Sequence, residues 1–154
     1  MADVLLPYLI VRVAAHLCAL PVAQVNEVLR VPALEAGGSN VHGLLGVTLL
    51  RGQPTAVLDL AVLLGLRQQA SEIGPGMRLV STRLEHDGTE QVIGLMVEEV
   101  VGLRALDPTT FEMIALPGGR ERAIGPFDRG FVSLVDACGV VPAEALQVRA
   151  GEPA

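Results

Sequence analysis

The chain has 154 residues, of which 51% are hydrophobic and 18% charged, a composition that excludes an intrinsically disordered protein. Eleven Lys and Arg against 17 Asp and Glu give a net charge of −6, with the basic residues scattered and aromatic residues at only 3%. A nucleic-acid-binding face needs clustered basic residues and stacking rings, so the composition argues against nucleic acid as a partner.

The first third of the chain predicts a hairpin, a short helix and a strand. Residues 8–13 and 16–20 are apolar runs on either side of a turn at Ala14 and Ala15. Pro21 favours the first turn of a short helix over residues 22–25. Residues 26–31 then read as extended, and residues 35–40 have the composition of a loop.

A second hairpin follows, centred on Arg51-Gly52, with an apolar strand on each side of the turn. Asp59 stands where it can cap a short helix over residues 60–64, which Gly65 would end. Residues 71–76 contain Ser, Gly and Pro and separate two halves of the chain.

The second half repeats the first. Residues 77–85 and 91–97 predict two strands, joined by a turn at residues 86–88. Two pairs of segments match: residues 95–100 resemble residues 20–25 at an offset of 75, and Arg129-Gly130 with Leu134-Val135-Asp136 resembles Arg51-Gly52 with Val57-Leu58-Asp59 at an offset of 77 or 78. We therefore predict an internal duplication and an all-β fold of two small barrels packed together.

Cys18 and Cys138 lie far apart in apolar stretches, which indicates free thiols in a reducing cytoplasm. Residues 5–13 are apolar, but Asp3 stands where a secretion signal carries basic residues, and Arg12 interrupts the apolar run. No stretch approaches the roughly 20 apolar residues of a spanning helix. We expect a cytoplasmic protein without direct membrane insertion, complete from Met1 to its end.

The segment Gly46-Val47-Thr48-Leu49-Leu50-Arg51-Gly52, followed by Val57-Leu58-Asp59-Leu60, resembles the CheW family. The family motif there reads Gly-Val-(Ile/Thr)-Asn-Leu-Arg-Gly, before an apolar strand that ends in Asp-Leu. Residues 20–28 and 94–100 resemble further family segments, and the resemblance extends from Tyr8 to Gly139.

The resemblance implies one CheW-like domain over residues 1–154, made of two SH3-like, five-stranded β-barrels with short helices. The implied limits are about 14–76 for subdomain 1 and about 77–139 for subdomain 2, with or without exchange of terminal strands between them. The implied function is that of a non-enzymatic adaptor. It would couple the cytoplasmic tip of a chemoreceptor (a methyl-accepting chemotaxis protein) to the regulatory domain of a CheA-type histidine kinase, in rings at receptor arrays. That kinase domain has the same double-barrel fold, and the helical receptor tip lies in a groove between the barrels.

The receptor groove implied by the family pattern contains nine residues: Leu9, Val22, Val25, Glu27, Val28, Arg51, Val97, Val100 and Val101. The alternative interpretation of the apolar members is ordinary barrel core, since most such residues are buried. Arg51 is either a turn residue or a charge at the partner site. Glu27 is expected to be exposed by strand alternation, as a solvated acid or as part of the site.

The sequence departs from the family at Leu49, where Asn is usual, and at Ala61, where a basic residue often follows Asp-Leu. The stretch 107–130 and the tail 140–154 are also short. These changes favour a specialised adaptor in which one partner interface is weakened.

No catalytic constellation, cofactor motif or metal-ligand pattern is present in the sequence. The three histidines are far apart, and Glu98 and Glu99 are adjacent, so on a strand they would point to opposite faces. Asp59 and Asp136 are interpreted as helix caps rather than catalytic acids. The alternative function is a small-molecule-binding or enzymatic β-barrel of similar architecture, which requires a deep pocket with converging polar groups.

Overall fold

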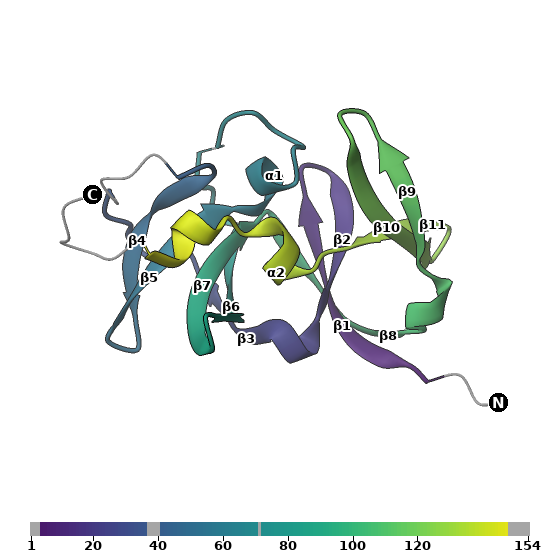
Figure 1. Cartoon of the computed structure of the whole chain (residues 1–154), viewed down its shortest axis with the longest axis horizontal. Coiled ribbons are helices and arrows are strands. Elements are labelled where there is room, and N and C mark those ends of the chain that lie inside the picture. The colour runs from purple at the N-terminus through teal and green to yellow at the C-terminus, as the bar shows by residue number, and fades with distance from the viewer. Residues whose placement is uncertain (1–3, 37–40, 71, 148–154) are drawn as a thin grey trace.

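The computed structural model describes residues 4–36, 41–70 and 72–147, and within them the chain forms two β-sheets (Figure 1). The five-stranded sheet contains β3 (Val25–Arg30), β4 (Leu44–Leu50), β5 (Gln53–Asp59), β6 (Arg78–His86) and β7 (Thr89–Val97). The six-stranded sheet contains β1 (Leu6–Val13), β2 (His16–Pro21), β8 (Glu99–Leu106), β9 (Glu112–Leu116), β10 (Arg120–Phe127) and β11 (Gly130–Leu134). The predicted all-β class is confirmed, and β9 is a sixth strand where five were expected.

The three predicted hairpins form around two-residue turns. The central residues are Ala14-Ala15 between β1 and β2, Arg51-Gly52 between β4 and β5, and Asp87-Gly88 between β6 and β7, all with positive φ (47° and 66°, 50° and 77°, 51° and 74°). Turns of this hand match the twist of the flanking strands, which explains why short local signals predicted them.

The duplication predicted from the sequence is visible in the strand orders, β3-β6-β7-β5-β4 and β8-β1-β2-β11-β10-β9. In each order, the first strand pairs antiparallel with the second, and the second pairs antiparallel with the third. The third strand pairs parallel with the fourth, and the fourth pairs antiparallel with the fifth. Each sheet also combines strands from both halves. The hairpin β1–β2 lies among β8–β11, and the hairpin β6–β7 lies among β3–β5, so the halves exchange their first hairpins.

The second Arg-Gly turn differs from the prediction. The turn between β10 and β11 has Asp128 and Arg129 at its centre, with φ of 50° at Asp128, and Gly130 already begins β11. Arg129 therefore matches Gly52 in position, and Asp128 matches Arg51. Aspartate tolerates the left-handed conformation, so this turn does not require the Arg-Gly pair.

Short helices follow the two matching strands, and both predicted caps are confirmed. Asp59 accepts a hydrogen bond from Ala61 N (3.0 Å) at the start of α1 (Leu60–Leu63), and Asp136 accepts one from Cys138 N (3.1 Å) at the start of α2 (Ala137–Val140). Gly65, with φ of 74°, follows the end of α1 as expected. The described residues also form three 3-10 helices: η1 (Val22–Gln24), η2 (Pro108–Thr110) and η3 (Ala143–Gln147).

One apolar core joins the two sheets. It contains Leu9, Val11 and Leu20 from the six-stranded sheet and Leu58, Val80 and Leu95 from the five-stranded sheet, all 5% exposed or less. We call it the shared core. A smaller cluster, with Tyr8, Ile10, Ala19, Phe127 and Val132, fills the six-stranded sheet alone. After α2 the chain returns to the other barrel, where Ala145 of η3 joins the shared core (Figure 1).

The predicted loop over residues 35–40 lies partly outside the described residues. Its first residue, Glu35, forms an isolated antiparallel bridge with β4. Glu35 and Val47 exchange two backbone hydrogen bonds of 2.9 and 2.7 Å along the outer edge of that strand. Glu112 of β9 pairs with Ile124 of β10 in the same way, 77 residues further on. The single Glu35 bridge beside β4 and the whole strand β9 beside β10 are therefore equivalent, and β9 is the longer of the two.

Candidate protein-binding surface

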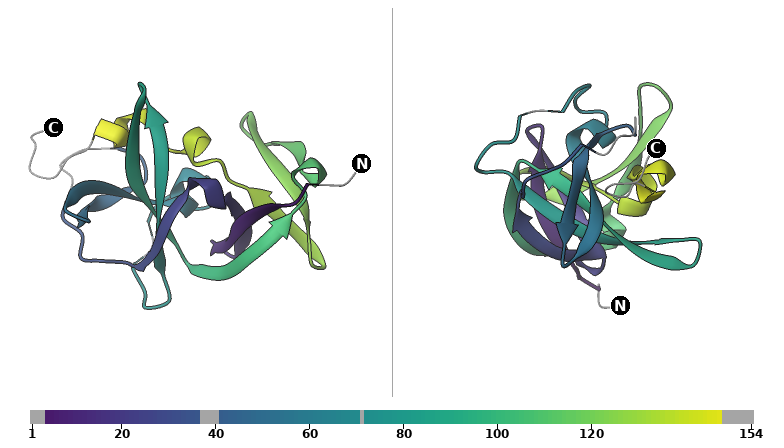
Figure 2. Two further views of the ribbon diagram at one scale, coloured as in Figure 1. Left: turned by 90° about the horizontal axis from the view of Figure 1, so that it is seen from below. Right: turned by 90° about the vertical axis from the view of Figure 1, so that its left-hand side faces the viewer.

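The chain passes from one sheet to the other at two equivalent places. The first is η1, between β2 and β3, and the second is Glu98, between β7 and β8. Seen from below, η1, β3 and the start of β8 face the viewer together (Figure 2). Because β3 and β8 are edge strands, this face is where the two barrels meet along exposed sheet edges. We call it the crossing face.

The strand register shows that the two matching sequence segments have the same backbone structure, including a β-bulge at the same position. Val25 pairs with Thr82 and Glu27 with Ser81, so Asn26 is an extra, bulged residue. Val100 pairs with Val11 and Gly102 with Ile10, so Val101 is bulged in the same place, 75 residues later. A bulge bends a strand and turns its side chains, and here it does so equally on both sides of the crossing face.

The nine predicted groove residues are not equally accessible. Leu9 (5% exposed) and Val97 (2%) belong to the shared core. Val25 and Val100 are half-buried and pack against that core, and Val22 is also half-buried. Val28 is 40% exposed, whereas Val101 packs against the smaller cluster of the six-stranded sheet. The alternative interpretation as core thus describes Leu9 and Val97, while Val22, Val25, Val28 and Val100 remain at the surface.

Glu27 and Arg51 form an ion pair that the sequence did not indicate. Arg51 Nε and one terminal nitrogen donate to the two carboxylate oxygens of Glu27 at 3.2 and 3.0 Å. The Glu27 side chain is only 22% exposed, so the expectation of an exposed acid was wrong. Strand alternation places the Glu27 side chain on the same, half-buried side of β3 as Val25 and Leu29. There the guanidinium of Arg51 neutralises the carboxylate. This hydrogen bond and the carboxylate's charge raise the pKa of Arg51.

The Glu27–Arg51 pair joins the two ends of the five-stranded sheet, because Glu27 lies on β3 and Arg51 lies in the turn after β4. At the second crossing, Glu98 contacts Arg67 (3.4 Å) and accepts a hydrogen bond from Ala15 N (3.3 Å), while Glu99 lies 3.8 Å from Arg12. The two adjacent acids therefore point to different partners and cannot work as an acid–base pair.

Two exposed apolar pairs were missed by sequence reasoning. Leu49 (63% exposed) pairs with Pro54 across β4 and β5, and Phe131 (57% exposed) pairs with Pro126 across β10 and β11. The two pairs stand at equivalent places, with the proline and the large side chain interchanged. We call them the hairpin patches. The duplication offset of 77 residues was the available signal, because it maps Leu49 onto Pro126 and Pro54 onto Phe131.

The family model for the CheW-like domain matches residues 7–144, most of the chain. The chain belongs to the CheW-like family. The solved structure of the scaffolding protein TtCheW from Thermoanaerobacter tengcongensis superposes with a TM-score of 0.75 at 18% identity, covering 94% of this chain and 92% of that one. No curated protein sequence matches the chain. The fold of this CheW-like chain is therefore that of a CheW scaffold, with two SH3-like subdomains.

The departures from the family pattern have defined places in the fold. Leu49 carries its side chain at the surface, in a hairpin patch, whereas Ala61 is 2% exposed in α1 and belongs to the shared core. The short stretch 107–130 forms η2, β9 and β10. Among the described residues, no helix is long and apolar enough to cross a membrane, and no group of His, Cys, Asp and Glu could hold a metal ion.

Proposed function

We propose that this CheW-like chain is a non-enzymatic chemotaxis adaptor of the cytoplasm. It would couple the cytoplasmic tip of a chemoreceptor to the regulatory domain of a CheA-type histidine kinase at receptor arrays. The observation that carries the proposal is the matched pair of crossings. Half-buried valines, Val22 and Val25 on one side and Val100 on the other, lie over a core shared by two barrels.

The crossing face suits the receptor tip because a helical hairpin needs an apolar strip with a few polar guides. Val25 and Val100 supply equivalent apolar positions on β3 and β8. Val28 is exposed beside them on β3, and the Glu27–Arg51 pair supplies fixed charges at the same edge. Leu9 and Val97 support this surface from below rather than contact the partner.

The hairpin patches suit a kinase domain that has the same duplicated fold. A partner with two equivalent barrels can meet an adaptor at two equivalent surfaces, and repetition of the two contacts extends the assembly. Leu49 with Pro54 and Phe131 with Pro126 offer one such surface on each barrel. The two patches differ in which residue is large, so they would bind with different strength, in keeping with a specialised adaptor.

The test is to titrate the chain separately with a receptor cytoplasmic tip and with a kinase regulatory domain. Val25→Asp and Val100→Asp should each weaken receptor binding at least tenfold and leave kinase binding unchanged, whereas Leu49→Asp and Phe131→Asp should do the reverse. Val4→Asp, at an apolar position that is 68% exposed and belongs to neither the nine groove residues nor the hairpin patches, is the matched control. Binding to neither partner would remove the proposal, and unfolding of Val25→Asp would show that this valine is core.

A further inference from the structure

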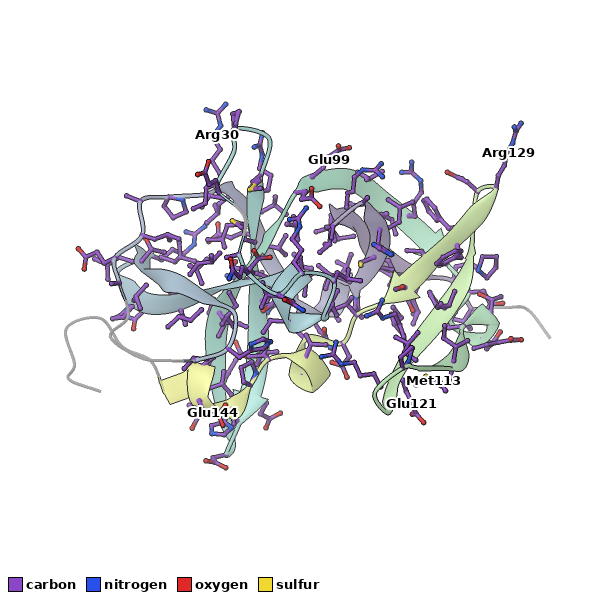
Figure 3. The ribbon with its side chains drawn as sticks, turned by 90° about the horizontal axis from the view of Figure 1, so that it is seen from above. Arg30, Glu99, Met113, Glu121, Arg129 and Glu144 are labelled. Carbon is purple, nitrogen blue, oxygen red and sulfur yellow. The ribbon has the colours of Figure 1, made fainter. Side chains whose placement is uncertain are left out.

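A cleft of about 640 Å³ lies between the two barrels and contains none of the nine predicted groove residues. Leu63 lines it from α1 and Leu64 from just after that helix, Arg120 and Arg122 from β10, Met113 from β9 and Val140 from α2. The volume falls in the range of ligand sites, and the wall is largely apolar with a few charged groups, as such sites usually are. Figure 3 labels Met113 of β9 and Glu121 of β10, which both line the cleft.

Two arginines converge on one carbonyl oxygen in this cleft. Arg120 and Arg122 are two residues apart on β10 and so share one face of the strand. Arg120 donates to Leu64 O at 3.3 Å and Arg122 donates to the same oxygen at 3.0 Å. A Cβ at Gly65 would collide with the guanidinium of Arg120, so the missing side chain of Gly65 makes room for it.

Arg120 and Arg122 have unused N–H donors and no ion-pair partner in the part of the chain that the structure describes. A guanidinium has five N–H donors, and each of these two is seen to use one on Leu64 O. Neither Arg120 nor Arg122 makes an ion pair within residues 4–36, 41–70 and 72–147. Two like charges beside one neutral acceptor repel each other, and an added anion would relieve that repulsion.

Two acids, Glu121 and Asp136, also line the cleft, but neither contacts the arginines through an ion pair among the described residues. Glu121 lies between the arginines in sequence, so its side chain leaves the opposite face of β10. Asp136 accepts hydrogen bonds from Gln24 Nε2 (2.9 Å) and Cys138 N (3.1 Å). The cleft wall as a whole carries two arginines and two acids, so its positive charge is confined to the face of β10 that holds Arg120 and Arg122.

We propose that the cleft binds a carboxylate group carried on an apolar body. The carboxylate accepts from the free N–H groups of Arg120 and Arg122, and the planar fork of each guanidinium fits two carboxylate oxygens. The apolar body lies against Leu63 and Val140. The source is either an acidic side chain of a partner protein or a free organic acid. This site is separate from the crossing face and does not depend on the adaptor function.

The test is an NMR titration of the ¹⁵N-labelled full chain, observing arginine Nε–H and backbone signals. Acetyl-Leu-Glu-Leu-amide and hexanoate represent the two sources, and acetyl-Leu-Gln-Leu-amide and hexanamide are their neutral counterparts. We expect saturable shifts of Arg120, Arg122 and residues 63–65 with both carboxylates and not with the amides. Tighter binding of the peptide assigns the site to a protein segment, and tighter binding of hexanoate assigns it to a free acid.

Variants separate the two arginines from general surface charge. Arg120→Gln and Arg122→Gln should each weaken carboxylate binding at least tenfold, and Arg122→Lys should weaken it less, because a lysine keeps the charge and loses the fork. Arg129→Gln is the control, since Arg129 lies in the turn at the far end of β10 (Figure 3).

Equal shifts with the amides, no saturation with either carboxylate, or an equal loss with Arg129→Gln would overturn the proposal. The comparison of carboxylate with amide uses the unaltered chain, so it decides the question even where a glutamine variant fails to fold.

Discussion

The two sheets have the same inner strands and different outer ones. Leu20 and Leu95, 75 residues apart, are both fully buried in the shared core, and Val25 and Val100 hold the same register beside equivalent bulges. At the periphery, Arg51 with its ion pair corresponds to Asp128, and the single Glu35 bridge corresponds to the strand β9. The interior positions are therefore alike in the two sheets, whereas the outer turns and edges differ.

The hairpin exchange makes each half incomplete, and separation of the halves is the strongest test of that comparison. In the five-stranded sheet, β6 and β7 lie between β3 and β5, so a fragment of residues 1–70 lacks the centre of its sheet. We expect fragments 1–70 and 71–154 to be unfolded alone and to regain the native NMR spectrum when mixed at equal amounts. A native-like spectrum from either fragment alone would show that the halves are independent barrels.

A shared core also predicts that equivalent residues in different sheets unfold together. Leu20→Ala and Leu95→Ala each remove a side chain that is 0% exposed, which typically destabilises a protein by about 2–5 kcal/mol. We expect similar losses within that range and a single urea transition for both variants. Two separate transitions, or a loss confined to the signals of one sheet, would mean that the barrels do not form one cooperative unit.

The two helix caps differ in burial, and this predicts a larger response to neutralisation at Asp59 than at Asp136. Asp59 is 2% exposed and its Oδ2 has no hydrogen-bond partner within the described residues, whereas Asp136 is exposed and also binds Gln24. Asparagine caps helices as well as aspartate does, and a buried charge without a full set of partners is costly.

Asp59→Asn should therefore raise the free energy of unfolding by about 1 kcal/mol, while Asp136→Asn should change it by less than about 0.5 kcal/mol, as surface substitutions do. Urea unfolding measures both. A clear loss of stability in Asp59→Asn would mean that Oδ2 has a donor, such as a buried water molecule.

The hairpin turns and helix caps were predicted from the sequence because each depends on residues that are close together in the chain. Residues such as Asp87-Gly88 and Arg51-Gly52 have the conformations that two-residue hairpin turns require, and an aspartate before an apolar run is a helix cap. The pairing of β1 with β8 and of β3 with β6 joins residues far apart in the chain, and no local signal encodes it. The exchange of hairpins was accordingly left open by the sequence.

The sequence indicated the equivalence of the two crossings but not how deeply their residues are buried. The match of residues 20–25 to 95–100 correctly paired Val25 with Val100. The burial of Leu9 and Val97 depends on which sheet covers them, and that follows from the hairpin exchange. The position of Glu27 depends on Arg51, a partner 24 residues away that only the closed sheet brings near.

The smallest expected effect concerns the Glu27–Arg51 pair, which has no counterpart among the described residues of the other barrel. Arg51 is mostly exposed, so the pair is screened by solvent, and we expect Arg51→Ala to lower the melting temperature slightly at low salt and hardly at all at high salt. Asp128→Ala, at the equivalent turn position, should show no such salt dependence because Asp128 makes no ion pair within the described residues.

An equal salt response in both variants would mean that the net negative charge of the chain, rather than the Glu27–Arg51 pair, is responsible for it. A large loss with Arg51→Ala that persists at high salt would instead indicate that Arg51 holds its turn, and through it the closure of the five-stranded sheet, by packing.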